Sequence, residues 1–576
     1  MNQKLENILN VSLDATEDEL RKADSLSTGY NWRDNTWEII VKYSGSLESI
    51  RNRYNVYIKE LLNYYAIIVA DKATIELISQ EDVIDYVEKP KSLYYQIERT
   101  KTAACVGNVR AGGGILSGKG VIVGVIDTGI DIFDNAFRNS DGTTRILNIY
   151  DQTTGEKYDK QSIDEYIKLD EDLSGGTFSY DNAPGVDNIM HGTDVSYIAA
   201  GSLGVAYEAD IIAVKMGYSI NNQFPRTTSL MDAIDYVIRK AIEYRKPVAV
   251  NISYGCNYGA HNGNTLLESF IDDISKSYRC VICVGSGNEA DKAIHFGGII
   301  NTGQVQTAYL SVGEYQSAMD IQIWKNYWDT IDVMLINPRG EQIGIITEGK
   351  INRYETYNTE IITLLGEPSP YNIYQEIYIN LIPKTDYILS GIWQIVLMAG
   401  SIRAGEYNIW LPSSQALGYA TAFNNPTADG TITIPATARN CIAVGAYNAY
   451  TNSYAAFSGR GFDNSIRNVN AGVKPDITAP GVDISIARQR GNDITYRNVT
   501  GTSYAVPVVT GAAALLMQWG IVMGNDRFMY GEKLKAALID GSKPVGLIGI
   551  TRNDNQPDPR TGWGAVCLKN TLNKIL

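Results

Sequence analysis

Apolar residues along this chain gather in short runs that predict strands and helices. Runs at residues 121–126, 209–216 and 247–254 are mostly apolar at successive positions, which is typical of strands buried on both faces of a parallel sheet. Residues 229–244 have helical spacing, and residues 508–517 are rich in small apolar side chains. This alternation of strands and helices predicts an α/β fold built on a parallel sheet.

The first part of the chain has a different pattern. Residues 36–43 alternate between apolar and polar side chains, as a half-buried strand does. Further strands are predicted at 65–70 and 83–90, with short helices between the strands. This order of elements predicts a small α+β domain over residues 1–96.

A third pattern occupies residues 302–429. Short strands recur there at even spacing, separated by turn sequences, and no helical period appears. Such a segment predicts an inserted all-β domain of the β-sandwich or jelly-roll type. The insertion divides the parallel-sheet domain into residues 97–301 and 430–576.

One serine stands where a helix is predicted to begin. Ser503 follows Gly501 and Thr502 and precedes the apolar run at 508–517. The backbone N–H groups at a helix N-terminus favour negative charge. Ser503 is therefore either a helix cap or a nucleophile, and a nucleophilic serine needs a neighbouring base.

The chain offers three histidines as candidates for that base. His191 opens a helix of small residues, whereas His261 and His295 lie in polar, Gly-rich stretches that are typical of loops. Asp127 ends the buried strand at 121–126. Acids at the carboxyl ends of parallel strands lie where α/β sheets hold their active sites, so Asp127 is a candidate to orient the base.

Three motifs around these residues resemble those of a known family. Asp127-Thr128-Gly129, His191-Gly192-Thr193 and Gly501-Thr502-Ser503-x-Ala505-x-Pro507 occur in this order. They resemble the signature blocks of subtilisin-like serine proteases. The resemblance implies a subtilisin-like parallel sheet with flanking helices, and a serine endopeptidase whose catalytic residues are Asp127, His191 and Ser503.

The same resemblance implies roles for residues at two other strand ends. Asn288 matches the family's oxyanion-hole asparagine, and the substrate-binding residues are expected to be Ser253, Tyr254, Gly255, Gly285, Ser286 and Gly287. Three positions depart from the family pattern. Met190 and Asp194 flank the His-Gly-Thr block. We interpret this change as local packing, with an effect of Asp194 on the pKa of His191 as the alternative. Tyr254 replaces a smaller aliphatic residue.

The N-terminal domain resembles the propeptide of subtilases, which assists folding and blocks the cleft with its C-terminal tail. This resemblance implies autocleavage near Gln96 and a propeptide that stays bound in the cleft. The alternative is a structural domain that is never removed.

Composition limits the partners and the setting. The formal net charge of −14 makes nucleic acid an unsuitable partner. The sequence shows neither a signal peptide nor an apolar run long enough to span a membrane. The six cysteines suit a reducing, intracellular setting, and Cys280 and Cys283 are expected on opposite faces of one strand. No cofactor is predicted, and a structural calcium ion stays open.

The combined features resemble the germination-specific, Csp-type subtilases of anaerobic spore-forming bacteria. That resemblance implies a protease packaged in the spore, which activates the zymogen of a cortex-degrading hydrolase during germination. Two alternatives remain: a general intracellular degradative protease, and a non-catalytic pseudoprotease sensor. The complete set of Asp127, His191 and Ser503 argues against the pseudoprotease, because such relatives usually lose one of the three.

Overall fold

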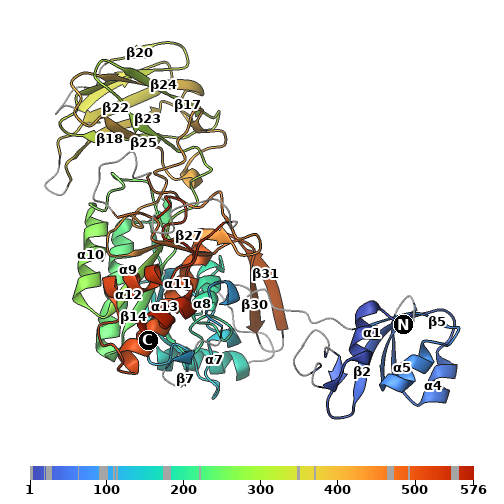
Figure 1. The fold of residues 1–576 in the computed structure, drawn as a ribbon. Coiled ribbons are helices and arrows are strands. Elements are labelled where there is room, and N and C mark those ends of the chain that lie inside the picture. The colour runs from blue at the N-terminus through green and yellow to red at the C-terminus, as the bar shows by residue number, and fades with distance from the viewer. Residues whose placement is uncertain are drawn as a thin grey trace. The chain divides into compact units, whose positions relative to one another are not determined.

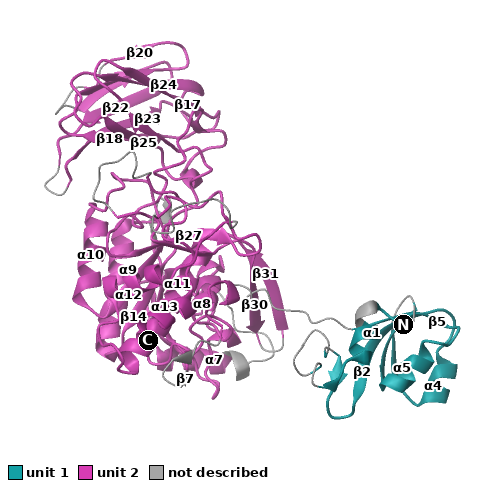
Figure 2. Ribbon diagram, in the orientation of Figure 1, with its two compact units in different colours: residues 1–95 teal, residues 96–576 magenta. Residues whose placement is uncertain are grey.

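A computed structural model gives the fold of the chain. It describes residues 4–17, 20, 27, 29–61, 64–89, 101–107, 110–111, 114–172, 183–219, 222–344, 346, 351–368, 372–462, 472–490, 493–546 and 557–576. The chain divides into two compact units, Met1–Tyr95 and Gln96–Leu576 (Figure 2). Each unit is described by itself.

The first unit is a five-stranded antiparallel sheet with helices. The expected strands at 36–43, 65–70 and 83–90 are present as β2, β4 and β5, and β3 was not predicted. Alternate side chains of β2 enter a core of aliphatic residues, as the period of two predicted. The elements are β1 (Tyr30–Asn31), β2 (Thr36–Tyr43), β3 (Tyr57–Leu61), β4 (Tyr65–Ala70), β5 (Ile84–Glu88), α1 (Asn7–Asp14), α4 (Glu48–Tyr54) and α5 (Lys72–Ile78).

A nine-stranded sheet forms the centre of the second unit (Figure 1). Its order is β10-β9-β11-β8-β14-β15-β27-β28, with β29 paired to β27, and the central strands are parallel. Every residue of β8, β14 and β15 is buried, which confirms the expectation from their apolar runs. The strands are β8 (Ile122–Asp127), β9 (Ile146–Asp151), β10 (Glu156–Asp159), β11 (Asp210–Lys215), β14 (Val248–Ile252), β15 (Cys280–Gly285), β27 (Ile442–Asn448), β28 (Ser453–Tyr454) and β29 (Ile477–Pro480).

Helices cover both faces of this sheet, so the predicted α/β fold with flanking helices is confirmed. One core holds side chains of α8 (His191–Ala200) and α11 (Thr502–Met517), and the core on the opposite face holds those of α9 (Thr227–Tyr244) and α10 (Leu266–Ser277). Cys283 belongs to the first core and Cys280 to the second, as predicted. Other elements are β6 (Arg110–Ala111), β7 (Gly114–Ile115), α7 (Lys160–Asp172), β12 (Tyr218–Ser219), β13 (Asn222–Pro225), β30 (Ile484–Arg490), β31 (Asp493–Val499), α12 (Gly531–Asp540) and α13 (Leu568–Ile575).

The helix that begins with the Gly-Thr-Ser motif is long and apolar. Together with the π-helical segment that follows it, Thr502–Val522 has the length and composition of a membrane span, so the expectation that the chain has no such run was wrong; 89% of its most apolar window is buried inside the protein. The helix packs against α8, β14 and β15. It is therefore a core helix of the catalytic fold.

The inserted segment forms two antiparallel sheets that share one hydrophobic core. It starts earlier than the predicted residue 302, because β16 already pairs with β25. The six-stranded sheet consists of β16 (His295–Ile299), β25 (Glu406–Trp410), β18 (Met319–Asn326), β23 (Tyr374–Pro383), β22 (Thr359–Leu365) and β21 (Ile351–Glu355), and the five-stranded sheet of β20 (Gln342–Ile343), β19 (Ile331–Ile336), β24 (Gly391–Ala399), β17 (Val305–Val312) and β26 (Ala422–Phe423).

One tryptophan joins the insertion to the catalytic part. Trp410, the last residue of β25, is stacked between the rings of His261 and His295, with centroids 4.2 and 4.9 Å away. Its indole N–H donates to the Gly430 carbonyl at 2.9 Å. Both histidines are buried and bonded to backbone carbonyls, so they are structural residues rather than surface-loop residues.

A disulfide joins two distant parts of the second unit. Cys105 and Cys567 are bonded, with their Cα atoms 4.8 Å apart, across 462 residues of sequence. This bond departs from the reducing setting that the cysteine pattern had suggested. No sequence pattern pointed to this pairing, because only the folded chain brings residue 105 beside the start of α13. Cys256, Cys280, Cys283 and Cys441 are free thiols.

We predict that Trp410→Ala destabilises the second unit. The Trp410 side chain is 1% exposed, and truncation of a buried Trp costs about 3–5 kcal/mol. The measurement is urea unfolding followed by circular dichroism. Tyr419→Ala is the matched control, because Tyr419 is an aromatic residue of the insertion that is 97% exposed. Equal unfolding midpoints for the two variants would refute the anchoring role of Trp410.

Candidate active site

The site is built on the carboxyl end of the central strand β8. Asp127, the last residue of this strand, is buried, and its Oδ1 accepts a hydrogen bond of 2.8 Å from the Thr128 N–H. The strand has parallel neighbours on both sides, β11 and β14. The carboxylate is therefore held at the end of a strand that is paired on both sides.

Helix α8 begins with His191 and approaches β8 very closely. A Cβ atom at Gly192 would lie 2.3 Å from the Gly129 carbonyl oxygen and 3.0 Å from the Asp127 Cβ. Only glycine fits between these atoms. The Gly192 N–H donates to the Thr128 hydroxyl at 2.9 Å, which ties the helix to the residue after Asp127.

Asp187 holds the two catalytic segments together, and the sequence analysis missed it. Its carboxylate is fully buried and accepts hydrogen bonds from the Thr128 hydroxyl, from the Met190 N–H, and from both the N–H and the hydroxyl of Thr193, at 2.7–2.8 Å. Asp187 lies three residues before Met190, which occupies the cap position of α8, so no local motif pointed to it.

His191 and Asp127 are directly bonded. Nδ1 of His191 lies 2.6 Å from Oδ1 of Asp127. Burial by itself lowers the pKa of His191, but the charge and hydrogen bond of Asp127 raise it, and Asp187 adds to the rise while Arg497 opposes it. The net result is a pKa above the ordinary value of 6.5, so Asp127 stabilises the imidazolium form.

Asp194 has a different effect from the one expected. It is fully buried in α8 and forms ion pairs with Arg488 and Arg497 of the β30–β31 hairpin. Because two guanidinium groups balance its charge, Asp194 is not among the main groups that shift the pKa of His191. Arg497, which pairs with Asp194, is one of those groups, and its charge lowers the pKa of His191.

Ser503 is the second residue of α11, and Gly501 occupies the cap position. Ser503 therefore does not cap the helix. Within the described part of the chain, neither its Oγ nor its N–H makes a hydrogen bond. Asn288 follows β15, and its Oδ1 accepts from the N–H and the hydroxyl of Thr502 at 3.0 and 3.1 Å. This arrangement leaves the Asn288 amide N–H₂ free to donate beside Ser503.

The six predicted substrate-binding residues lie at the ends of β14 and β15, which are paired strands. The Ser253 hydroxyl donates to the Ser503 carbonyl at 3.2 Å. A Cβ atom at Gly255 or Gly287 would collide with Thr433, and a Cβ atom at Gly285 would touch Thr502. The Ser286 side chain is buried, and the Tyr254 ring packs at the edge of a hydrophobic core. The two strand ends thus meet beside the start of α11.

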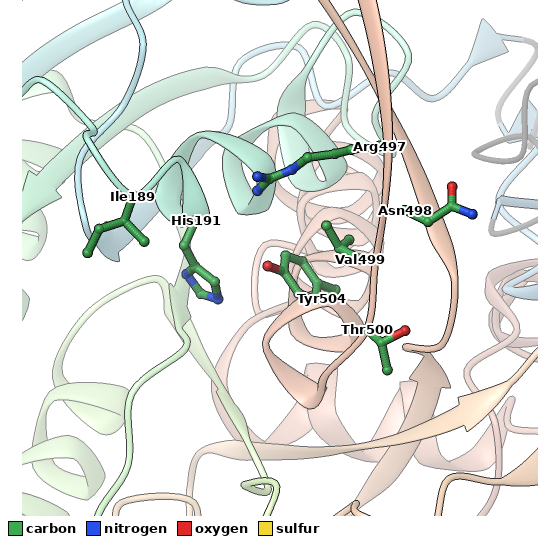
Figure 3. Close-up of a pocket in the computed structure, with 7 residues that line it drawn as sticks. All are labelled: Ile189, His191, Arg497, Asn498, Val499, Thr500 and Tyr504. Atoms are coloured by element: carbon green, nitrogen blue, oxygen red, sulfur yellow. The ribbon is translucent and has the colours of Figure 1, made fainter. Parts of the chain in front are cut away.

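A pocket of about 340 Å³ opens on the His191 side of the site (Figure 3). The described residues that line it come from the start of α8, from β31 and from the turn into α11: Ile189, His191, Arg497, Asn498, Val499, Thr500 and Tyr504. The rings of Tyr504 and His191 lie 5.2 Å apart.

Two expectations concern other parts of the chain. Gln96, the predicted cleavage position, lies outside the described residues. Over the described ranges, no three His, Cys, Asp or Glu side chains are grouped as a metal site would require.

Comparisons with known proteins identify two matching family models. The subtilase family model matches residues 118–369 and 404–564, and the model of the Csp protease B prodomain matches residues 3–91. The solved structure of the CspB protease of Clostridium perfringens is 34% identical, with a TM-score of 0.74, and the match covers 82% of this chain and 96% of that one.

Two curated relatives match shorter segments. The subtilase-type proteinase RRT12 of Saccharomyces cerevisiae is 33% identical over 128 residues, which is 22% of this chain and 23% of the relative. Subtilisin-like protease 10 of Arthroderma otae is 34% identical over 120 residues, 21% of this chain and 27% of the relative. The match thus spans about a quarter of the length of each.

We predict that Asp187→Asn lowers the pKa of His191. Loss of the negative charge removes one of the interactions that favour the imidazolium, so the titration moves to lower pH. An NMR titration of the imidazole measures the shift, and the chain has only three histidines to assign. Asp235→Asn on α9 is the control. An unchanged or raised pKa in Asp187→Asn would contradict the role of Asp187.

Proposed function

The chain belongs to the subtilase family and is a subtilisin-like serine peptidase, and from this premise we propose that Ser503, His191 and Asp127 are its catalytic residues. The observation that carries the proposal is the 2.6 Å bond between His191 Nδ1 and Asp127 Oδ1. This bond fixes the tautomer whose Nε2 has a free lone pair, and it is Nε2 that must accept a proton from serine.

The proposed reaction is acyl transfer in two stages. His191 removes the proton of the Ser503 hydroxyl as Oγ attacks the substrate carbonyl, and Asp127 stabilises the resulting imidazolium. His191 then protonates the leaving amine, and the C–N bond breaks. In the second stage water takes the place of serine: His191 removes its proton as the water oxygen attacks the acyl carbon. The bond between that carbon and Ser503 Oγ then breaks, and His191 returns the proton to Oγ.

Two donors are positioned for the oxyanion. The Ser503 N–H points from the first turn of α11, where the helix dipole also favours negative charge. Asn288 is held through its Oδ1 by Thr502, which orients its N–H₂ group independently of substrate. Preorganised donors of this kind need no rearrangement as charge develops in the transition state.

We further propose that the enzyme cuts few protein substrates and activates the zymogen of a spore cortex-degrading hydrolase during germination. The match to the Csp protease B prodomain and the similarity to the CspB protease support this role. The proposal includes autocleavage near Gln96, a propeptide that remains in the cleft, and a location inside the spore. The test is incubation of the purified protein with the hydrolase zymogen, and the expected product is a single cut that releases cortex-degrading activity. Extensive degradation of the hydrolase and of unrelated proteins would favour a general protease.

We predict that Ser503→Ala lowers peptidase activity by several orders of magnitude, because the nucleophile is lost while binding and oxyanion groups remain. The variant chain should also stay uncut near Gln96. Mass spectrometry of the purified protein checks the second outcome, and Ser453→Ala on β28 is the control. Processing of Ser503→Ala at the wild-type position would show that another protease makes the cut.

We predict that Asn288→Ala lowers kcat by roughly 10²–10³-fold and leaves KM nearly unchanged, because the lost donor acts mainly in the transition state. Steady-state kinetics on a peptide substrate separate the two constants. A variant with normal kcat and a raised KM would contradict the oxyanion role and assign Asn288 to ground-state binding.

A further inference from the structure

The pocket beside His191 lies on one side of the proposed reaction centre. Its seven described lining residues include His191 and Tyr504, the residue after the nucleophile, but none of those predicted to hold the acyl part of the substrate. Those residues lie at the ends of β14 and β15, beside Thr433 and Thr502, and none of them lines the pocket. Since His191 delivers its proton to the leaving amine, the His191 side receives the chain that follows the scissile bond.

Arg497 gives this pocket a positive charge. It is the one permanently charged side chain among the seven lining residues, and Figure 3 shows its guanidinium extending from β31 toward the start of α8. The carboxylates near it are turned away from solvent. Asp127, Asp187 and Asp194 are each at most 1% exposed, and none of them lines the pocket.

Asp194 does not depend on Arg497 alone. The Arg497 Nη2 bonds to the Met190 carbonyl at 3.2 Å and pairs with Asp194. Asp194 has a second partner in Arg488, which contacts it through both Nε and Nη2 and is less exposed than Arg497. The side chain of Arg497 is 40% exposed, so an incoming carboxylate can reach it.

We propose that Arg497 is a specificity-determining residue that selects a carboxylate side chain at the first or second position after the scissile bond. This inference rests on the proposed function and names a feature of its substrates. The chain's own sequence fits it: after the proposed cut at Gln96 come Ile97 and Glu98, which place an acid at the second position.

The experiment begins with the cut that wild-type protein makes in a peptide spanning residues 91–100, located by mass spectrometry. The peptide is then varied at the first and second residues after that cut, with Glu, Gln or Lys at each. We expect kcat/KM to fall in the order Glu, Gln, Lys at one of these positions. The Glu-to-Gln ratio should be about two- to fivefold, the scale of a partly exposed ion pair, and should shrink as salt is added.

Protein variants assign the preference to a residue. Arg497→Gln should bring the Glu-to-Gln ratio close to one, and Arg497→Lys should keep a preference for Glu. Arg488→Gln is the matched control, because it removes the other partner of Asp194 from outside the pocket. A merely structural role for Arg497 would lower kcat/KM for all peptides equally and leave the ratios unchanged.

The possible results distinguish failure of the Arg497 role from failure of the proposed protease function. Wild-type protein that cuts the peptides with equal kcat/KM, or whose preference does not respond to salt, overturns the role of Arg497 and leaves the protease intact. This measurement needs no variant, so it stands even if Arg497→Gln fails to fold. If Arg488→Gln and Arg497→Gln lose the preference for Glu over Gln equally, the role of Arg497 is also overturned. If neither the peptide nor the full-length chain is ever cut, the proposed function fails, and this inference fails with it.

Discussion

The active site depends on the close approach of α8 to the end of β8. Gly192 lies against the Gly129 carbonyl and the Asp127 side chain, with room for a hydrogen atom and no room for a methyl group. The bond between His191 and Asp127 exists only because the helix can come this near. Asp187 then closes the junction by accepting donors from both segments, which satisfies N–H groups that a helix start leaves unpaired. The geometry of the base is thus set by backbone contacts before any substrate arrives.

Asn288 and Ser503 are separated in sequence by the whole inserted β-sandwich. Contacts at the base of the insertion hold Asn288 beside the start of α11 despite this separation. Glu289, the neighbour of Asn288, accepts from the N–H and hydroxyl of Ser414 just after β25, and Trp410 of β25 is buried between two histidines. The insertion is therefore attached next to the asparagine that must meet Thr502. If Asn288 donates to the oxyanion as proposed, a displacement of about 1 Å at such a site would cost about 10²-fold in rate, and catalysis would then depend on rigid docking of the insertion.

The sequence predicted the parts of this structure that are encoded locally. The strands β8, β14 and β15 were visible as apolar runs, and Asp127, His191 and Ser503 stood in short motifs at strand and helix ends. The missed features depend on contacts between distant residues. The Cys105–Cys567 bond, the pairing of β16 with β25 and the ion pairs of Asp194 join segments that only the fold brings together. Asp187 is a further case, since it lies outside the cap position of α8 and only the fold brings it to Thr128.

The ion pairs of Asp194 show why this departure from the family pattern is more than a local packing change. A carboxylate buried in α8 is costly unless it is paired, and both of its partners lie on the β30–β31 hairpin. The hairpin leads directly through Thr500 into Gly501 and the start of α11. The charged cluster therefore links the helix that carries His191 to the segment that delivers Ser503. Loss of both arginines would leave the buried Asp194 charge without compensation, so the acid and the two arginines together stabilise the junction between α8 and the hairpin.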